Sequence, residues 1–251
     1  MLLRDRLFNI LKQHAAGQLF LDVWPGYMPL LDGTVHRLPG KVREMIRLWE
    51  KNATLQEESR ESYAAYEGGD LFDVGAFNGW YFWLLAPKAA AGDRFVSCEP
   101  DSRITNDLLR NLASFTKIFP QIPVTYISQP IGSGGALKTI PNPGGGHPQF
   151  GSDVAADGGC RTLTLDALAA TLGIQPAFVK IDVEGAEFSV LQGMERLMDE
   201  TDPTIMIEIH PTYLPAGVTV DDVHAILRRH GYQGRVDTSG NVAMREIWKK
   251  V

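Results

Sequence analysis

Hydrophobic and polar positions follow a regular pattern from Asp70 to the end of the chain. Short runs rich in β-branched and aromatic residues alternate with longer segments in which apolar residues recur at helical spacing. The runs predict strands at residues 70–76, 94–99, 124–128, 177–183, 204–210, 232–236 and 242–247. Because helical segments separate the first five, the pattern predicts right-handed βαβ units and a mainly parallel sheet covered on both faces.

The last two predicted strands are joined only by the five residues Asp237-Thr-Ser-Gly-Asn241, and so short a link favours an antiparallel hairpin. The prediction is therefore an α/β fold with a doubly wound, Rossmann-like sheet of seven strands that ends in this hairpin. Residues 67–251 form the sheet domain in this interpretation, and residues 1–66 form a helical N-terminal extension that contacts substrate or a second copy.

A run of breakers interrupts the pattern between the third and fourth strands. Residues 141–159 contain Pro141-Asn-Pro-Gly-Gly-Gly-His147 and show no apolar period, which predicts a long loop. Such loops are either functional flaps or solvated insertions. In the first case His147 and Phe150 are candidate substrate contacts.

Composition narrows the class of protein. A chain of 251 residues with 44% hydrophobic and 22% charged residues is an ordinary globular protein, and a formal charge of −6 argues against a nucleic-acid partner. Charges interrupt the apolar residues near the N-terminus, so no signal peptide or integral membrane segment is expected there. Cys98 and Cys160 lack metal or redox spacing, and we predict a cytoplasmic protein. The amphipathic residues 2–11 and the helical run from Lys41 are candidate interfaces of a homo-oligomer.

A glycine-containing turn follows the first predicted strand and opens a helix. The turn, Asp73-Val-Gly-Ala-Phe-Asn-Gly79, lets a ligand approach the backbone at Gly75 and meet free N–H groups near Gly79. The second strand ends at Glu99-Pro100, where a carboxylate can accept both hydroxyls of an adenosine ribose. The sequence therefore predicts a cofactor site, whose residues are Asp73, Gly75, Ala76, Phe77, Asn78, Gly79, Glu99, Pro100 and Asp182.

Two cofactor classes fit such a site, dinucleotides and S-adenosylmethionine. The turn has Gly-x-x-x-Gly spacing instead of the Gly-x-Gly-x-x-Gly pattern of dinucleotide domains, and the closing hairpin is also foreign to those domains. Both features favour the methyltransferase version of the sheet.

Charged side chains cluster where two apolar strands end. Lys180, Asp182 and Glu184 share one parity of the fourth strand, and Glu208 and His210 end the fifth. Ligands of open α/β sheets bind outside the carboxyl ends of the strands, so these residues predict a catalytic site.

Each ionisable residue has an expected role. Asp182 is expected beside the cofactor, and His210 or Glu208 is expected to take a proton from the acceptor, with His210 preferred for its pKa near neutrality. In a competing interpretation Asp182, Glu208 and His210 share Mg²⁺. Lys180 is expected to form a structural ion pair. Glu184 and Glu187 are expected at the start of a helix, where the helix dipole favours acids, and this role is preferred for Glu187.

Taken together, the motifs resemble the FkbM-type S-adenosylmethionine-dependent methyltransferases between about Asp70 and Pro211. The resemblance rests on Asp73-Val-Gly-Ala-x-x-Gly79, Glu99-Pro100 followed by Asn111-Leu112, Thr164-Leu-Asp-Ala-Leu168, Val179-Lys-Ile-Asp-Val-Glu-Gly-Ala-Glu187 with Val190-Leu-Gln-Gly193, and Ile207-Glu-Ile-His210. It implies a class I methyltransferase fold, S-adenosylmethionine as donor and O-methylation of a sugar or another small hydroxylated metabolite. One position departs from the family pattern, because Phe77 stands where the family usually has Asn.

Two other functions remain open at this point. An NAD-dependent oxidoreductase would share the sheet and Glu99 but requires the missing glycine pattern. A noncatalytic cofactor-binding module would bind the cofactor without turnover.

Overall fold

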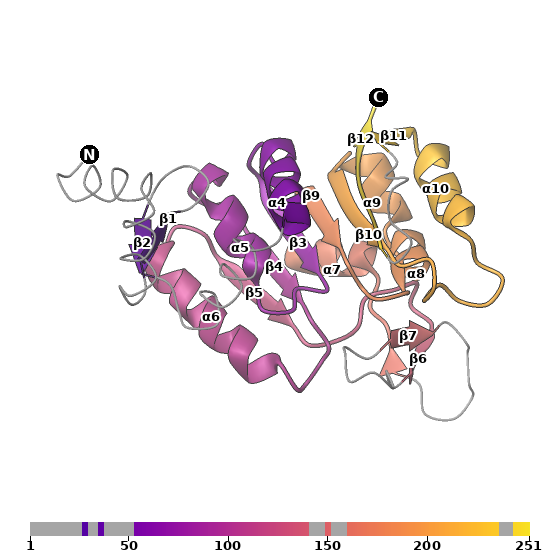
Figure 1. Ribbon diagram of the computed structural model, residues 1–251, viewed down its shortest axis with the longest axis horizontal. Coiled ribbons are helices and arrows are strands. Elements are labelled where there is room, and N and C mark those ends of the chain that lie inside the picture. Colours follow the sequence, from indigo (N-terminus) through magenta and orange to yellow (C-terminus); the bar gives the residue numbers. More distant parts are fainter. Residues whose placement is uncertain (1–26, 30–34, 38–52, 141–148, 152–159, 236–242) are drawn as a thin grey trace.

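A mixed seven-stranded sheet forms the centre of the protein (Figure 1). The computed structural model describes residues 27–29, 35–37, 53–140, 149–151, 160–235 and 243–251. The strand order is β11-β12-β10-β9-β3-β4-β5. The strands span β3 Asp70–Val74, β4 Phe95–Cys98, β5 Val124–Ile127, β9 Pro176–Ile181, β10 Thr204–Ile209, β11 Tyr232–Arg235 and β12 Met244–Lys250. All seven overlap predicted strands, so the predicted fold class is confirmed.

Chain direction in the sheet creates a crevice beside β3. The pairs β3–β4, β4–β5, β3–β9 and β9–β10 are parallel, whereas β12 runs antiparallel to both β10 and β11. From β3 the chain first winds outward through β4 and β5, and later returns to β9 on the other side of β3. Ligands of doubly wound sheets bind at this switch point, outside the carboxyl ends of the strands.

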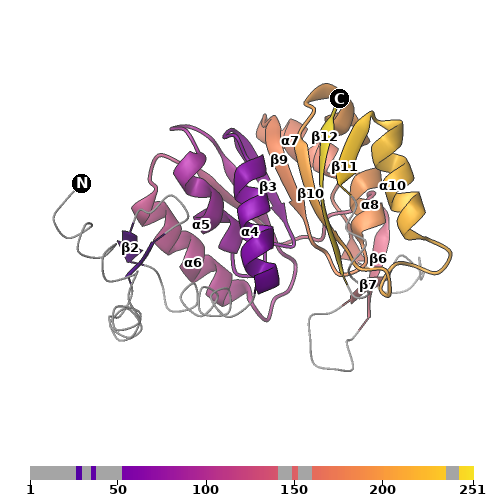
Figure 2. The same ribbon diagram turned by 45° about the horizontal axis from the view of Figure 1, so that its top comes forward.

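Helices cover both faces of the sheet, as Figures 1 and 2 show. The first face packs against aromatic residues of α5 and α6 and against Tyr66, which directly follows α4. The second face packs against α7, α8, α9 and α10. The helices span α4 Ala53–Ala65, α5 Trp80–Leu85, α6 Thr105–Ile118, α7 Leu165–Leu172, α8 Glu187–Gln192, α9 Glu195–Glu200 and α10 Val220–Arg229, and a 3₁₀ turn η1 covers Ala86–Lys88.

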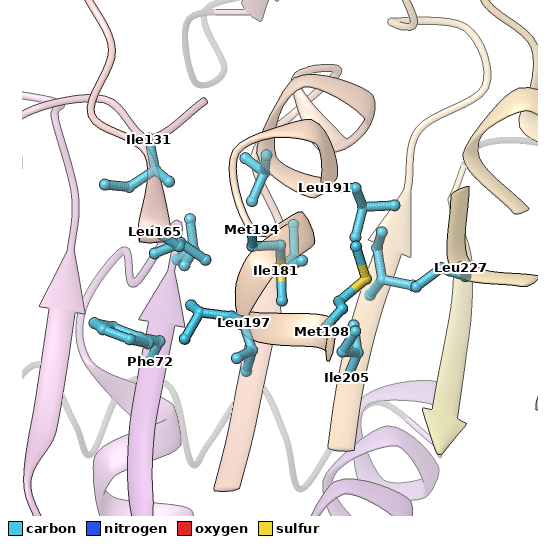
Figure 3. Packing of buried hydrophobic residues seen from close by; sticks show 14 of the residues in the cluster. Phe72, Ile131, Leu165, Ile181, Leu191, Met194, Leu197, Met198, Ile205 and Leu227 are labelled. Carbon is cyan, nitrogen blue, oxygen red and sulfur yellow. The ribbon is translucent and has the colours of Figure 1, made fainter. Parts of the chain in front are cut away.

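Alternation within the strands divides the core into two clusters. Leu71 faces the first side of the sheet and Phe72 the second, as the period of two requires. Figure 3 shows the second cluster, in which Leu197 and Met198 of α9 lie over the sheet residues Ile181 and Ile205. Both clusters hold fully buried residues, so the strands beneath the crevice are fixed from both faces.

The N-terminal segment differs from the predicted helical extension. Helix α4 is present, but Tyr27–Pro29 (β1) and Val35–Arg37 (β2) form an antiparallel pair that the sequence did not predict. Three-residue strands are too short to show a period of two, which explains why the sequence gave no sign of this pair. Residues 2–11 and the start of the run at Lys41 lie outside the described residues.

The predicted loop before β9 is bordered by a small antiparallel sheet. Its strands are β6 Ala136–Ile140, β7 Gln149–Gly151 and β8 Cys160–Arg161, in the order β7-β6-β8. Phe150 pairs with Thr139 across β7 and β6, so at this position the loop prediction was wrong. His147 lies outside the described residues. Among the helices that the structure describes, none has both the length and the hydropathy needed to cross a membrane.

Candidate active site

A pocket of about 270 Å³ opens at the carboxyl ends of β3, β4, β5 and β9. It lies at the switch point that the strand order creates, where a ligand of this fold class is expected. Its lining residues are Val74, Gly75, Phe77, Cys98, Glu99, Pro100, Asp101, Gln129, Pro130, Ile131, Asp182, Val183, Glu184 and Ala186.

The turn after β3 is held tightly between two neighbouring loops. The Gly75 N–H donates to the Cys98 carbonyl at 2.9 Å, and a Cβ atom on Gly75 would lie 1.7 Å from the Asp182 carbonyl oxygen. Gly75 also has φ 77°, a conformation that side chains disfavour. Phe77 adopts φ 48° and is partly exposed beside the pocket. Glycine is therefore required at 75, and the turn brings the ends of β3, β4 and β9 together.

Glu99 is fixed at the β4 side of the pocket by backbone groups. Its Oε2 accepts the Phe77 N–H at 2.9 Å and its Oε1 accepts the Asp101 N–H at 2.8 Å. Burial raises the pKa of Glu99, although these two hydrogen bonds oppose the shift. Each carboxylate oxygen has a second lone pair, so both can still accept a ligand hydroxyl.

Four of the predicted cofactor residues shape the turn without lining the pocket: Asp73, Ala76, Asn78 and Gly79. Asn78 Oδ1 accepts the Trp80 N–H at 3.2 Å, which satisfies a donor at the start of α5. The structure places Gly75, Phe77, Glu99, Pro100 and Asp182 on the pocket itself.

Lys180 is a buried cation between two carboxylates. Its Nζ donates to the Gly75 carbonyl at 2.6 Å and lies 3.5 Å from Asp73 Oδ1 and 3.4 Å from Asp182 Oδ2. Burial would lower the pKa of Lys180, but the charges of Asp182 and Asp73 outweigh burial and raise the pKa above its usual value. The predicted structural ion pair is confirmed.

His210 lies among carboxylates behind the pocket. Its Nδ1 is 2.9 Å from Oε1 of the fully buried Glu187, and its Nε2 is 3.6 Å from Glu184 Oε2 and 3.8 Å from Glu208 Oε1. Burial would lower the pKa of His210, but the hydrogen bond to Glu187 and the carboxylate charges raise the pKa to about 9. The imidazole of the free protein therefore carries a proton at neutral pH, which opposes a role as general base. Glu187 also accepts the Gly185 N–H, so it supports the helix start as well as His210.

Glu208 is held by residues from outside the predicted site. Arg245 on β12 donates to Oε1 at 2.8 Å and to Oε2 at 3.1 Å, and Arg245 also pairs with Glu58 of α4 at 2.9 Å. Glu58 in turn accepts the Tyr81 hydroxyl hydrogen at 2.6 Å. Burial and the Asp182 charge raise the pKa of Glu208 to about 7, although Arg245 opposes them.

Replacing Arg245 with Met is expected to lower the free energy of unfolding by about 2 kcal/mol, because Glu208 and Glu58 would then face each other without their shared cation. The expected loss is smaller than for a fully buried pair, since a quarter of the Arg245 side chain is exposed. Urea unfolding at pH 8 measures the change. The exposed Arg110→Met, on a surface pair of α6, is the control. A loss no larger than that of the control would show that the network contributes little.

The structure adds site residues that the sequence did not indicate. Three lining residues follow β5 and belong to no motif: Gln129, Pro130 and Ile131. Their position directly after the third predicted strand could have indicated that they line the pocket. Glu184 also lines the pocket, and the sequence had placed it in the charged cluster after the fourth strand without a catalytic role of its own. Of the three predicted catalytic residues, Asp182 lines the pocket, while His210 and Glu208 are buried behind it.

A seven-stranded sheet of this order, with its pocket at the carboxyl ends of the central strands, is the class I methyltransferase fold. The family model for the Methyltransferase FkbM domain matches residues 73–233. The chain belongs to this family of methyltransferases. The predicted family is thereby confirmed.

Several solved structures of methyltransferases are similar to this chain, and the first of them shares its fold. The methyltransferase FkbM of Methylobacillus flagellatus KT is 21% identical with a TM-score of 0.51, and the match covers 72% of this chain and 44% of that one. This chain thus corresponds to less than half of that protein's length. A precorrin-6y C5,15-methyltransferase of Geobacter metallireducens GS-15 is 14% identical (TM-score 0.46, 78% and 88% covered). A methyltransferase of Geobacter sulfurreducens is 16% identical (TM-score 0.46, 90% and 100% covered). No curated protein matches the chain.

Proposed function

We propose that the protein transfers a methyl group from S-adenosylmethionine to a hydroxyl of a sugar or another small hydroxylated metabolite. The observation that supports this most is that one pocket has carboxylates on two opposite sides. Glu99 lies on the β4 side, and Asp182 and Glu184 lie on the β9 side. A ribose-binding acid and an acceptor-binding pair would then lie on opposite sides of β3.

The cofactor side of the pocket suits S-adenosylmethionine. The orientation of Glu99 is fixed by two backbone N–H groups, and its free lone pairs can accept the two ribose hydroxyls. Pro130 and Ile131 offer apolar surface for the adenine base, and Gly75 lines the pocket without a side chain of its own. When bound, the cofactor supplies an electrophilic methyl group on a sulfonium.

The acceptor side needs groups that orient a hydroxyl and receive its proton. Asp182 and Glu184 keep about 30% and 33% of their side chains exposed, whereas His210 and Glu208 are buried behind them. We therefore assign hydroxyl contact to Asp182 and Glu184. His210 and Glu208 are buried charged groups next to them and maintain the arrangement of charges on the acceptor side of the pocket. The negative charge of the chain agrees with a small-molecule acceptor and not with nucleic acid.

Calorimetric titration with S-adenosylmethionine and, separately, with NADH tests the cofactor. The donor should bind at micromolar concentration and NADH should not. Incubation with methyl-labelled donor and a panel of free sugars, nucleotide sugars and polyhydroxylated natural products then tests the acceptor class. Label in a hydroxyl-derived methyl ether supports the proposal, whereas label on nitrogen or carbon, or NADH binding, contradicts it.

Glu99→Gln is expected to weaken S-adenosylmethionine binding roughly 30-fold, about 2 kcal/mol, because hydrogen bonds to a charged acceptor are lost. The new amide would also oppose the N–H group of Phe77 or Asp101. Calorimetry measures the affinity, and Glu200→Gln on the exposed surface of α9 is the matched control. Unchanged binding in the Glu99 variant would exclude it from ribose recognition.

A further inference from the structure

We propose that Asp182, Glu184 and His210 form a binding site for a divalent cation, Mg²⁺ or Mn²⁺. The site lies on the β9 side of the pocket, where Asp182 and Glu184 line it, and we call this side the acceptor edge. Each residue offers one ligand atom, and the three atoms lie within 4.8 Å of one another. Ligands at about 2.1 Å from an octahedral ion are roughly 3 to 4.2 Å apart, so small side-chain rotations would complete the site.

The orientation of His210 supports this proposal independently of the carboxylates. The side chain is buried, with only 7% of its surface exposed, and its Nδ1 is anchored to the buried Glu187. Its Nε2 makes no hydrogen bond among the residues that the structure describes and faces Glu184 Oε2 from 3.6 Å. A histidine whose second nitrogen is held by a carboxylate is the usual arrangement of a metal ligand. The ion would displace the proton that the imidazole carries at neutral pH in the free protein, so binding is expected to release a proton and to strengthen as the pH rises.

The two carboxylates are placed to receive an ion from solvent. Asp182 and Glu184 line the pocket and are partly exposed, so water and acceptor hydroxyls can reach the remaining coordination positions. Lys180 lies 3.4 Å from one Asp182 oxygen, and a carboxylate has a second oxygen to offer. Glu184 adopts φ 51°, a conformation uncommon for a residue with a side chain.

Glu208 does not belong to this group of ligands. Both of its oxygens accept hydrogen bonds from Arg245, which holds them away from an ion. The proposed ligand set therefore differs from the sequence-based hypothesis of Asp182, Glu208 and His210, because Glu184 takes the place of Glu208.

The ligand chemistry favours a hard cation. Two carboxylates, one imidazole and open positions for water suit Mn²⁺ or Mg²⁺ better than the closed sulfur and nitrogen sites of structural zinc. The role of the ion rests on the proposed function: it would orient two vicinal hydroxyls of the acceptor and lower the pKa of the one that reacts. The site itself does not depend on that role.

The experiment is a titration of the full chain with Mn²⁺ in the absence of donor and acceptor, followed by the electron paramagnetic resonance signal of free Mn²⁺. We expect one ion per chain with a dissociation constant of about 0.1 mM or lower. Glu184→Gln and Asp182→Asn should each weaken binding roughly tenfold or more. Glu208→Gln should weaken it less than either, and the control Asp107→Asn on α6 should leave it within about threefold.

Two results would overturn the proposal. One is a wild-type protein that binds no Mn²⁺ below about 1 mM. The other is a Glu184 variant that binds like the wild type while the Glu208 variant does not. S-adenosylmethionine titration of the same preparations separates the two proposals, since loss of the cation site leaves donor binding measurable, and failure of donor binding leaves the Mn²⁺ result intact.

Discussion

Asp182→Asn is expected to slow methyl transfer roughly 100- to 1,000-fold, the range in which loss of a group that orients or deprotonates a reactant falls. Asp182 combines contact with the pocket, partial exposure and a neighbouring cation in Lys180. Asn keeps the shape but removes the charge that would attract the proton of the acceptor or a cation. Affinity for S-adenosylmethionine should change less than about threefold, because Glu99 on the other side of β3 is untouched.

Two measurements separate a catalytic from a structural effect of this change. Calorimetry gives donor affinity, and turnover of the acceptor found with labelled donor gives kcat apart from KM. Asp107→Asn, which removes the same charge at a partly exposed position of α6, should leave both values unchanged. Full turnover in the Asp182 variant would remove this residue from the mechanism, and a parallel loss of donor binding would reassign it to the cofactor side.

Gly75→Ala is expected to lower the free energy of unfolding by about 4 kcal/mol, or to prevent folding. The new Cβ would lie 1.7 Å from the Asp182 carbonyl oxygen, and backbone is not free to move aside. The positive φ adds about 1 kcal/mol of strain.

Gly217→Ala is the matched control, because Gly217 also has a positive φ (84°) but a Cβ there would meet nothing within 4 Å. Urea unfolding of the two variants should therefore differ by about 3 kcal/mol. Equal losses would mean that the close approach of the β3 turn to Asp182 is not what requires glycine at 75.

The sheet was predictable because its signals are local. A buried parallel strand such as β9 carries a continuous apolar run, and the parity of Lys180 and Asp182 within it shows directly in the sequence. Gly75 and Glu99 follow their strands immediately, so their place at the pocket followed from strand order alone. By contrast, β1 and β2 are too short for any periodicity to appear.

The acceptor edge was less predictable because its contacts are distant in sequence. Arg245 reaches Glu208 only because β12 returns antiparallel beside β10, and Glu58 arrives from a helix before the first strand of the sheet. Neither residue carries a motif, and both belong to charged segments that usually read as solvent-exposed. Glu184 was not predicted to have a catalytic role of its own, since the left-handed backbone conformation of this residue cannot be inferred from residue type.

The ion-pair network of Glu58, Glu208 and Arg245 limits how far this protein can be truncated. The family match ends at residue 233 and begins at residue 73, so Arg245 and Glu58 both lie beyond it. A fragment cut at those limits would lack β12, which separates β10 from β11 in the sheet, and would leave Glu208 without its cation. The part of the chain that the family model matches would thus lack both residues that anchor Glu208 at the acceptor edge, and truncated variants for expression should keep residues 53–251.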